Sequence, residues 1–323
     1  MFRIITILII SFTALVTQPV AHAETTPGQK AVLITGASTG LGRVMAETLA
    51  AQGYFVYAGA RKDKDLQELN AIENIQAVKL DVNKQQQIDA AVKTITEAGR
   101  GLYGLVNNAG VVVLSPLIEI EEQDFHFQMN VNIYGPYRIT RAFAPLIMES
   151  KGRISIIGSI SGTLSSATWG PYSMTKHAME AYADALADEM KHFDVQVSLI
   201  EPGTYRSKIA QNALDRMEDR DQTTDDSKLK VQMDESVNWL SAFEETSGDP
   251  IEVADAVIKA LFDDNPKRRY LVTPNQAQTN WTINTAIQRM VEQNTDQKYS
   301  LSRAELIEML DAAMAKQGGA GSP

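Results

Sequence analysis

The sequence predicts a doubly wound α/β fold, in which a seven-stranded parallel sheet carries helices on both faces. Two observations lead to this prediction. Short apolar segments alternate with helix-forming stretches of ten or more residues, and a glycine-rich turn follows the first apolar segment. Strands that alternate with helices form βαβ units, and right-handed crossovers arrange such units as an open parallel sheet covered on both sides.

The expected strands are short apolar segments that end at turns or helix starts. They cover residues 31–34, 55–58, 75–80, 102–106, 153–158, 195–200 and 269–273. Helix-forming content predicts a first helix over residues 41–51, closed by Gly53. A second long helical stretch runs from Pro171 to about His192. Strands separated by helices of this length are typical of a parallel sheet.

Two segments depart from the alternation. Residues 211–236 are polar and rich in acids, which is typical either of a lid or flexible excursion or of a solvated surface helix. The tail from Gln276 contains two helical patterns. Ser302 and Glu305 form a capping box for the second pattern, and residues 318–321 are expected to fray.

Composition narrows the possible functions. The chain has 323 residues, of which 44% are hydrophobic and 22% charged, as in ordinary globular proteins. The absence of cysteine excludes disulfides, Fe–S clusters and Cys-ligated zinc. The four histidines lack ligand-like spacing with acids, so we expect no metal site. A net charge of −10 argues against a nucleic-acid partner. A small anionic ligand can still be held by local geometry.

Residues 1–23 have the three-part plan of a secretory signal peptide. Arg3 precedes an uncharged, mostly apolar run over 4–16, and Ala21 and Ala23 place small residues at positions −3 and −1 of a cut after residue 23. The run is too short to span a bilayer comfortably. We therefore expect export. The alternatives are membrane association through residues 4–16 as an anchor, and a cytoplasmic protein with an apolar N-terminus.

A glycine-rich turn separates the first expected strand from the first helix. Residues 35–42, Thr-Gly-Ala-Ser-Thr-Gly-Leu-Gly, have the spacing G-x-x-x-G-x-G. Glycine permits a tight turn and close approach of the backbone to a ligand, and the N-terminus of the next helix attracts anions. The turn therefore predicts a site for the pyrophosphate of a dinucleotide, although such a turn can also be a simple connector.

The end of the second expected strand bears on the choice of dinucleotide. An acid at this place would bind the ribose 2′-hydroxyl and favour NAD. This chain has Arg61 and Lys62 there instead. Cations can pair with a 2′-phosphate, so we expect NADP(H) in preference to NAD(H). Asp81, at the end of the third strand, either accepts from the adenine amine or caps the helix that follows.

Ser159, Tyr172 and Lys176 form a second group of candidate residues. Tyr172 and Lys176 are four residues apart in the long expected helix, so they share a face. Ser159 follows the fifth expected strand, at the sheet edge where open α/β proteins bind ligands. We expect the Lys176 ammonium to lower the pKa of the Tyr172 phenol toward the range of a general acid/base. A serine hydroxyl beside them can polarise a carbonyl oxygen.

The motifs of this chain, and their order along it, resemble those of the compact, single-domain short-chain dehydrogenases/reductases, which have a Rossmann fold. The resemblance runs from about Lys30 to about Thr273. It is carried by residues 35–42, Asn107-Asn108-Ala109-Gly110, Asn132 within Met129-Asn130-Val131-Asn132, Ser159, Tyr172-Ser173-Met174-Thr175-Lys176 and Pro202-Gly203. Residues 201–206 and 266–272 are similar to the branch that contains 17β-hydroxysteroid and retinol dehydrogenases.

The resemblance implies a domain plan. A linker over 24–29 leads into one NAD(P)-binding domain over 30–275, which includes an insert over 204–249. A helical extension over 276–323 follows. Family members commonly associate through their helices, so the resemblance also implies a homodimer or homotetramer.

The resemblance implies a catalytic role for four residues. Tyr172 exchanges a proton with the reacting oxygen, Lys176 holds the nicotinamide ribose, Ser159 orients the oxygen, and Asn132 holds a water that links Lys176 to solvent. The implied cofactor contacts are Thr35, Gly36, Ser38, Thr39, Gly40, Leu41, Gly42, Arg61, Asp81, Val82, Asn108, Ala109, Gly110, Tyr172, Lys176, Pro202, Gly203, Thr204 and Ser207, the last of which stands where the family usually has Thr.

These residues together predict an NAD(P)-dependent oxidoreductase that interconverts a secondary alcohol and a ketone or aldehyde. The substrate is expected to be small and apolar. The expected pocket walls are Val112, Leu114, Ser161, Leu164, Trp169 and Tyr205. Two alternatives stay open: a redox-inactive nucleotide-binding or scaffold protein with this fold, and a methyltransferase with a similar sheet, which would not need the Tyr–Lys pair.

Overall fold

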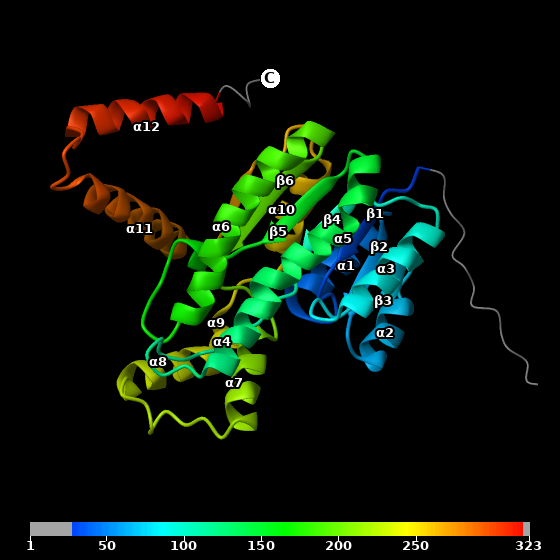
Figure 1. The fold of residues 1–323 in the computed structure, drawn as a ribbon, viewed down its shortest axis with the longest axis horizontal. Helices are drawn as coiled ribbons and strands as arrows, with labels where there is room; N and C mark the ends of the chain where they lie inside the picture. Colours follow the sequence, from blue (N-terminus) through cyan, green and yellow to red (C-terminus); the bar gives the residue numbers. More distant parts are fainter. Residues whose placement is uncertain (1–27, 319–323) are drawn as a thin grey trace, which may run out of the picture.

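The computed structural model describes residues 28–318. Its seven strands are β1 (Ala31–Ile34), β2 (Phe55–Ala60), β3 (Ile75–Lys79), β4 (Gly104–Asn107), β5 (Arg153–Ile157), β6 (Gln196–Pro202) and β7 (Arg269–Val272). They form one parallel sheet in the order β3-β2-β1-β4-β5-β6-β7 (Figure 1). Each strand overlaps the segment predicted for it, so the predicted doubly wound sheet is confirmed.

Six helices cover the two faces of the sheet. One layer contains α3 (Gln85–Glu97), α5 (Gly135–Glu149) and α6 (Gly170–Met190), and the other contains α1 (Gly40–Ala51), α2 (Asp63–Asn70) and α10 (Ile251–Phe262). Each layer buries its own hydrophobic cluster against the strands. Phe143 and Ile147 of α5 belong to the first cluster, and Leu49 of α1 and Val257 of α10 belong to the second. Because both faces are buried, the strands are apolar along most of their length.

The strand order places a crevice at the centre of one sheet edge. β1 pairs with β2 on one side and with β4 on the other, so the chain winds outward in opposite directions from this point. In open α/β sheets, ligands bind outside the carboxyl ends of the strands where the order reverses. The turns that follow β1 and β4 are therefore expected to meet at a ligand site.

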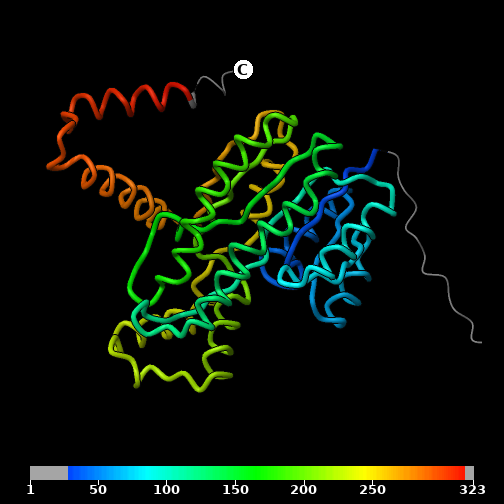
Figure 2. The backbone as a smooth tube through the Cα atoms, in the orientation of Figure 1, coloured from blue at the N-terminus to red at the C-terminus, as the bar shows by residue number. Residues whose placement is uncertain are grey.

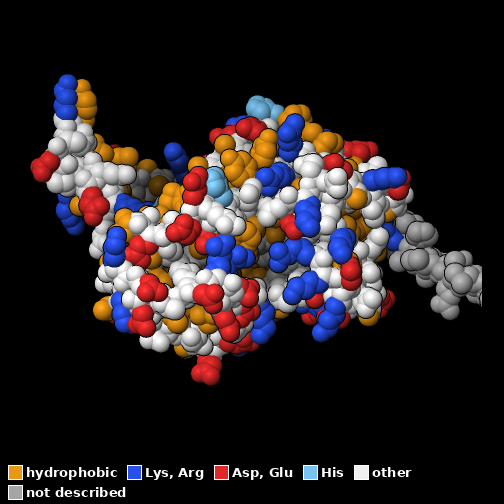
Figure 3. All heavy atoms as spheres, turned by 60° about the horizontal axis from the view of Figure 1, so that its bottom comes forward, with side chains coloured by type: hydrophobic (Ala, Val, Ile, Leu, Met, Phe, Trp, Pro, Cys, Tyr) orange, Lys and Arg blue, Asp and Glu red, His pale blue; other side chains and the backbone are white. Residues whose placement is uncertain are grey.

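The insert after β6 lies over the carboxyl edge of the sheet and is mostly helical. It comprises α7 (Ile209–Asp219), α8 (Lys230–Ser241) and α9 (Phe243–Thr246). Each of the two longer helices packs by one face, through Ala213 and Met217 of α7 and through Met233 and Leu240 of α8. Figure 3 turns this end toward the viewer, and acidic side chains predominate over the lower left part of the surface. The acid-rich segment therefore consists of parts of two packed helices joined by an irregular connection over 220–229.

The C-terminal part forms two helices, as predicted. α11 (Gln276–Asn294) leads away from the sheet, and α12 (Arg303–Gly318) follows it after a turn (Figures 1 and 2). The predicted capping box is confirmed, because the Ser302 N–H donates to Glu305 Oε2 over 2.7 Å and the Glu305 N–H donates to Ser302 Oγ over 3.3 Å. None of the helices within residues 28–318 is apolar over a length that would cross a membrane. The predicted leader and residues 319–321 lie outside the described residues.

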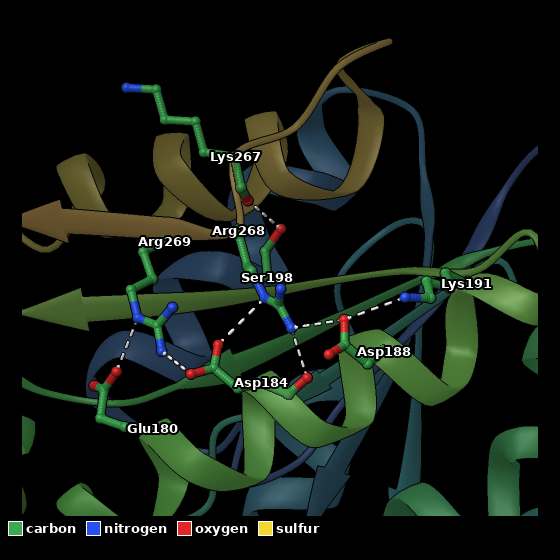
Figure 4. A network of polar contacts seen from close by, with 8 residues as sticks. All are labelled: Glu180, Asp184, Asp188, Lys191, Ser198, Lys267, Arg268 and Arg269. Carbon is green, nitrogen blue, oxygen red and sulfur yellow. Dashed lines mark hydrogen bonds and ion pairs between the residues drawn. The ribbon is translucent and has the colours of Figure 1, made fainter. Parts of the chain in front are cut away.

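A charged network joins α6 to the start of β7 (Figure 4). Arg269 donates through Nε to Glu180 Oε2 over 3.0 Å and through Nη2 to Asp184 Oδ2 over 2.8 Å. Arg268 Nε lies 3.2 Å from the other oxygen of Asp184. On β6, the Glu201 carboxyl is only 7% exposed. Burial, followed by the charge of Glu180, raises the pKa of Glu201 to about 7.

Glu201→Gln is expected to change how stability depends on pH. In the folded protein Glu201 keeps its proton up to a pKa of about 7, whereas the unfolded chain loses it near the ordinary value of 4.5. The unfolding free energy of the wild type should therefore fall by about 1–3 kcal/mol as pH rises between these values, and then level off. The variant should lack this fall. Urea unfolding from about pH 5 to pH 8 measures it.

The exposed residue Glu73 offers a matched control for this experiment. Glu73→Gln should leave the pH profile of the wild type unchanged, because no buried carboxyl is removed. Parallel profiles for Glu201→Gln and the wild type would show that Glu201 is ionised in the folded protein throughout this range.

Candidate active site

The glycine-rich turn after β1 forms a backbone cradle that side chains would fill. Gly36 and Gly40 have φ angles of +66° and +56°, a region that favours glycine. A Cβ on Gly42 would lie 2.3 Å from the Gly36 carbonyl oxygen, and one on Gly40 would lie 2.7 Å from the Cβ of Ser207. Only glycine fits at these places, so the backbone itself forms the surface of the turn.

The first turn of α1 is suited to an anion. Its N-cap residue Thr39 makes no side-chain capping hydrogen bond, and the first turn contains no acidic residue. The backbone N–H groups and the positive end of the helix dipole are therefore left without a competing side chain. Together with the glycine cradle, this arrangement fits the pyrophosphate of a dinucleotide.

Thr35 and Asn108 hold the turns after β1 and β4 together. The Thr35 hydroxyl oxygen accepts from the backbone N–H of Asn108 over 3.0 Å and of Ala109 over 3.1 Å. The Asn108 side-chain amide donates to the carbonyl oxygens of Thr35 over 2.9 Å and Gly36 over 3.1 Å. Thr35 is thus a buried structural brace that does not line the cleft, and its predicted contact with a cofactor stays a prediction.

One cleft of about 560 Å³ runs along the carboxyl edge of the sheet and collects most of the predicted residues. By the strand order, Asp81 after β3 and Arg61 after β2 lie toward one end, and the glycine turn after β1 comes next. Tyr172, on the helix that follows β5, lies farther along. The predicted residues that line it are Gly36, Ser38, Thr39, Gly40, Leu41, Gly42, Arg61, Asp81, Val82, Asn108, Ala109, Gly110, Val112, Ser159, Ser161, Leu164, Trp169, Tyr172, Lys176, Pro202, Gly203, Thr204, Tyr205 and Ser207.

Leu114 is not among the residues that line the cleft. Its side chain is 1% exposed and belongs to the packed cluster beneath α7 and α8. Its carbonyl oxygen accepts from the Gln222 side chain over 3.3 Å, which ties the loop after β4 to the insert. Leu114 therefore supports the pocket from behind, and its prediction as a wall residue is wrong.

Asn132 is buried behind the cleft and braces it. It lies in a single π-helical turn (Asn130–Tyr134) between α4 (Glu122–Met129) and α5. Its side-chain amide donates to the carbonyl oxygen of Val111 over 2.9 Å and to Thr175 Oγ1 over 3.1 Å, and Oδ1 accepts from the Val111 N–H over 2.9 Å. The side chain is fully used in these bonds, so Asn132 fixes the loop after β4 against α6. Its link to a water stays a prediction.

Ser159, Tyr172 and Lys176 converge in the cleft, and each is 8% exposed. Ser159 Oγ accepts from the Ser161 N–H over 3.0 Å and shares a hydrogen bond with the Tyr172 hydroxyl. Lys176 Nζ donates to the carbonyl oxygen of Ile157 over 2.9 Å and lies 5.6 Å from the centre of the Tyr172 ring. The three side chains therefore share one buried site, as predicted.

The electrostatics of this site differ from the prediction. Burial raises the pKa of Tyr172 to about 12, and the hydrogen bond with Ser159 offsets only part of this rise. Burial also lowers the pKa of Lys176 to about 8. The pKa of the phenol is thus raised and not lowered as expected, because burial removes the hydration that stabilises the phenolate.

The far end of the cleft has an exposed cation. Arg61 lines the cleft, whereas its neighbour Lys62 does not. Within residues 28–318, Arg61 takes part in none of the ion pairs, so its guanidinium is available to a ligand. Asp81 also lines the cleft, and its Oδ1 accepts from the Asn83 N–H over 3.0 Å, which forms a local turn.

The cleft also contains residues that were not predicted from the sequence, and four of them are large side chains from the insert and from α11. Trp239 and Phe243 come from the insert, and Gln278 and Trp281 come from α11. These segments carry no motif with a fixed spacing, so only the scarcity of tryptophan, three in the whole chain, could have pointed to them. Within residues 28–318, no three His, Asp or Glu side chains are grouped as a metal site.

Comparison with known proteins agrees with this geometry. The family model described as short chain dehydrogenase matches residues 30–218. The uncharacterized oxidoreductase YbbO of Escherichia coli is 35% identical over 247 residues, covering 76% of this chain and 86% of that protein. Retinol dehydrogenase 7 of the mouse is 31% identical over 266 residues, covering 78% of this chain and 82% of that protein.

A solved structure shows the same fold. A short chain dehydrogenase/reductase from Burkholderia phymatum in complex with NAD superposes with a TM-score of 0.70 at 23% identity, covering 84% of this chain and 98% of that one. The chain belongs to the short-chain dehydrogenase family, as its motifs predicted. Its class is therefore that of the NAD(P)-binding oxidoreductases with a Rossmann fold.

Proposed function

We propose that the protein is an NADP(H)-linked oxidoreductase that interconverts an apolar secondary alcohol and the corresponding ketone or aldehyde. The observation that carries this proposal is the convergence of Ser159, Tyr172 and Lys176 on the cleft that also contains the glycine turn. This arrangement supports an enzyme over a redox-inactive scaffold, since a scaffold has no need for a buried phenol and amine. The same phenol and amine also argue against a methyltransferase, which would not need them.

Tyr172 is the proton donor in the reductive direction. The bound nicotinamide supplies a hydride to the carbonyl carbon, or accepts one from the alcohol. As the carbonyl oxygen gains electron density, the Tyr172 hydroxyl transfers its proton to it, and the hydrogen bond from Ser159 orients the oxygen. A pKa raised to about 12 keeps the phenol protonated at neutral pH, which suits reduction.

The free guanidinium of Arg61 supports the preference for NADP(H). It lies at the end of β2, on the cleft wall and beyond the glycine cradle that fits the pyrophosphate. A 2′-phosphate carries negative charge that a guanidinium can bind with two parallel hydrogen bonds. The first acid after β2 is Asp63, which pairs with Lys79 and does not line the cleft.

Replacing Tyr172 by Phe tests the mechanism. Tyr172→Phe should lower kcat for NADPH-dependent reduction of an apolar ketone by about 10²- to 10⁴-fold, the usual contribution of a general acid. The affinity for NADPH, measured by titration, should stay close to that of the wild type. The rate is measured as loss of NADPH absorbance.

Tyr182→Phe serves as the control for that substitution. Tyr182 lies on the same helix but does not line the cleft, so the same loss of a hydroxyl should leave the rate nearly unchanged. Equal rates for Tyr172→Phe and the wild type would remove Tyr172 from the mechanism.

Removing Arg61 tests the cofactor preference. Arg61→Ala should raise the Kd for NADPH by about tenfold to a hundredfold, since hydrogen bonds to charged groups contribute about 1.5–3 kcal/mol. The Kd for NADH should change by less than about threefold. Lys62→Ala, which alters the neighbouring cation outside the cleft, should affect neither. A wild type that binds NADH more tightly than NADPH would overturn the preference.

A further inference from the structure

All three tryptophans of the chain line the same cleft, although they come from separate elements. Trp169 directly precedes α6, which carries Tyr172. Trp239 belongs to α8 of the insert, and Trp281 belongs to α11 of the C-terminal extension. Two of the three thus come from segments outside the βαβ units that form the sheet.

Aromatic rings lead from the catalytic tyrosine toward the rim of the cleft. The Trp169 and Tyr172 rings have centroids 6.1 Å apart and an interplanar angle of 75°. Trp169 and Trp239 follow at 5.2 Å and 89°, and Trp239 and Phe243 at 5.0 Å and 76°. Edge-to-face contacts of this kind fix the orientation of the rings. The wall therefore offers rigid ring faces and edges to whatever occupies the cleft.

The innermost tryptophan is held in place by hydrogen bonds. Trp169 Nε1 donates to Ser236 Oγ over 3.2 Å, and the Thr168 hydroxyl lies 2.8 Å from the same oxygen. Ser236 and Thr168 are both buried. Because the indole N–H is satisfied within the protein, Trp169 presents only apolar surface to a ligand.

α11 is attached to the loop that forms the floor of the cleft after β6. The Thr204 N–H donates to Gln278 Oε1 over 2.9 Å, and a Cβ on Gly203 would lie 2.3 Å from the same oxygen. Trp281 follows Gln278 by three residues, so it lies on the same side of the helix. Trp281 is 57% exposed and Trp239 is 43% exposed, which places both at the rim.

The charges around this part of the cleft disfavour an anionic substrate. Among the described residues that line the cleft, Lys208 pairs with Glu244 over 3.4 Å, and Lys176 already donates to a backbone carbonyl. Arg61 lies at the dinucleotide end, and Glu235 adds a negative charge at the rim beside Trp239. A substrate carboxylate would therefore lack a free cation near Tyr172 and would meet an acid at the entrance.

We propose that Trp239 and Trp281 are specificity-determining residues that select carbonyl compounds with a flat, apolar, aromatic body. The carbonyl reaches Ser159 and Tyr172, and the flat body contacts the two rim tryptophans, where stacking removes apolar surface from water. This inference rests on the proposed function and assigns its substrate class.

The test compares a flat ketone with a small one. For the wild type and each variant, kcat/KM is measured with 2-acetonaphthone and with 2-butanone, using NADPH. Trp239→Ala and Trp281→Ala should each lower kcat/KM for 2-acetonaphthone by about tenfold, and should change that for 2-butanone by less than about twofold. Trp281→Phe should recover most of the loss, because it restores an aromatic face.

Ile287→Ala provides the matched control on α11, since Ile287 is exposed on that helix and does not line the cleft. It should behave as the wild type with both ketones. Equal losses with the two ketones in Trp239→Ala and Trp281→Ala, or no loss with either, would overturn the assignment of specificity.

A binding measurement separates this inference from the proposed reaction. In the Tyr172→Phe background, 2-acetonaphthone binding is followed by tryptophan fluorescence in the presence of NADP, and adding Trp281→Ala should weaken it by about tenfold. Unchanged affinity would contradict the rim assignment even if the enzyme is active. A wild type that oxidises no NADPH with either ketone would contradict the proposed function, while the binding titration would still decide the role of the tryptophans.

Discussion

Burial of the Tyr172 phenol and the Lys176 amine in one cleft is the constraint on which the site depends. Exclusion of water makes the charged form of each group costly, so the pKa of Tyr172 rises to about 12 and that of Lys176 falls to about 8. Lys176 instead donates to the Ile157 carbonyl, and Ser159 is the partner of the phenol. Tyr172 is therefore a protonated phenol at neutral pH.

The fold positions this pair by joining loops that are distant in the sequence. The reversal of strand order between β1 and β4 brings the glycine turn beside the loop after β4, and Thr35 and Asn108 lock the two together. Asn132, set inward by a π-helical turn, fixes that same loop against α6. A π-helical turn often marks a functional site because it redirects a side chain within a helix. The buried polar contacts of Thr35, Asn108 and Asn132 thus position both the cofactor surface and the helix that carries the proton donor.

The parts that the sequence predicts are those with a local pattern. Strands buried on both faces are short apolar segments, the glycine turn has a fixed spacing, and Tyr172 and Lys176 are one helical turn apart, so each could be located without the structure. The direction of the Tyr172 pKa required knowledge of burial, which no motif records. Trp239 and Trp281 reach the cleft only through the packing of α8 and α11, and the inward position of Leu114 likewise depends on the insert above it.

Ultraviolet titration of the Tyr172 phenolate tests the central claim most directly. The absorbance of cofactor-free wild type minus that of Tyr172→Phe isolates this one phenol as pH is raised. With its pKa raised to about 12, Tyr172 should still be protonated at the ordinary tyrosine value of 10.0, and the difference should show almost no phenolate there. A phenolate that is half formed at or below that pH would contradict the account, because it would show that burial does not raise the pKa of Tyr172.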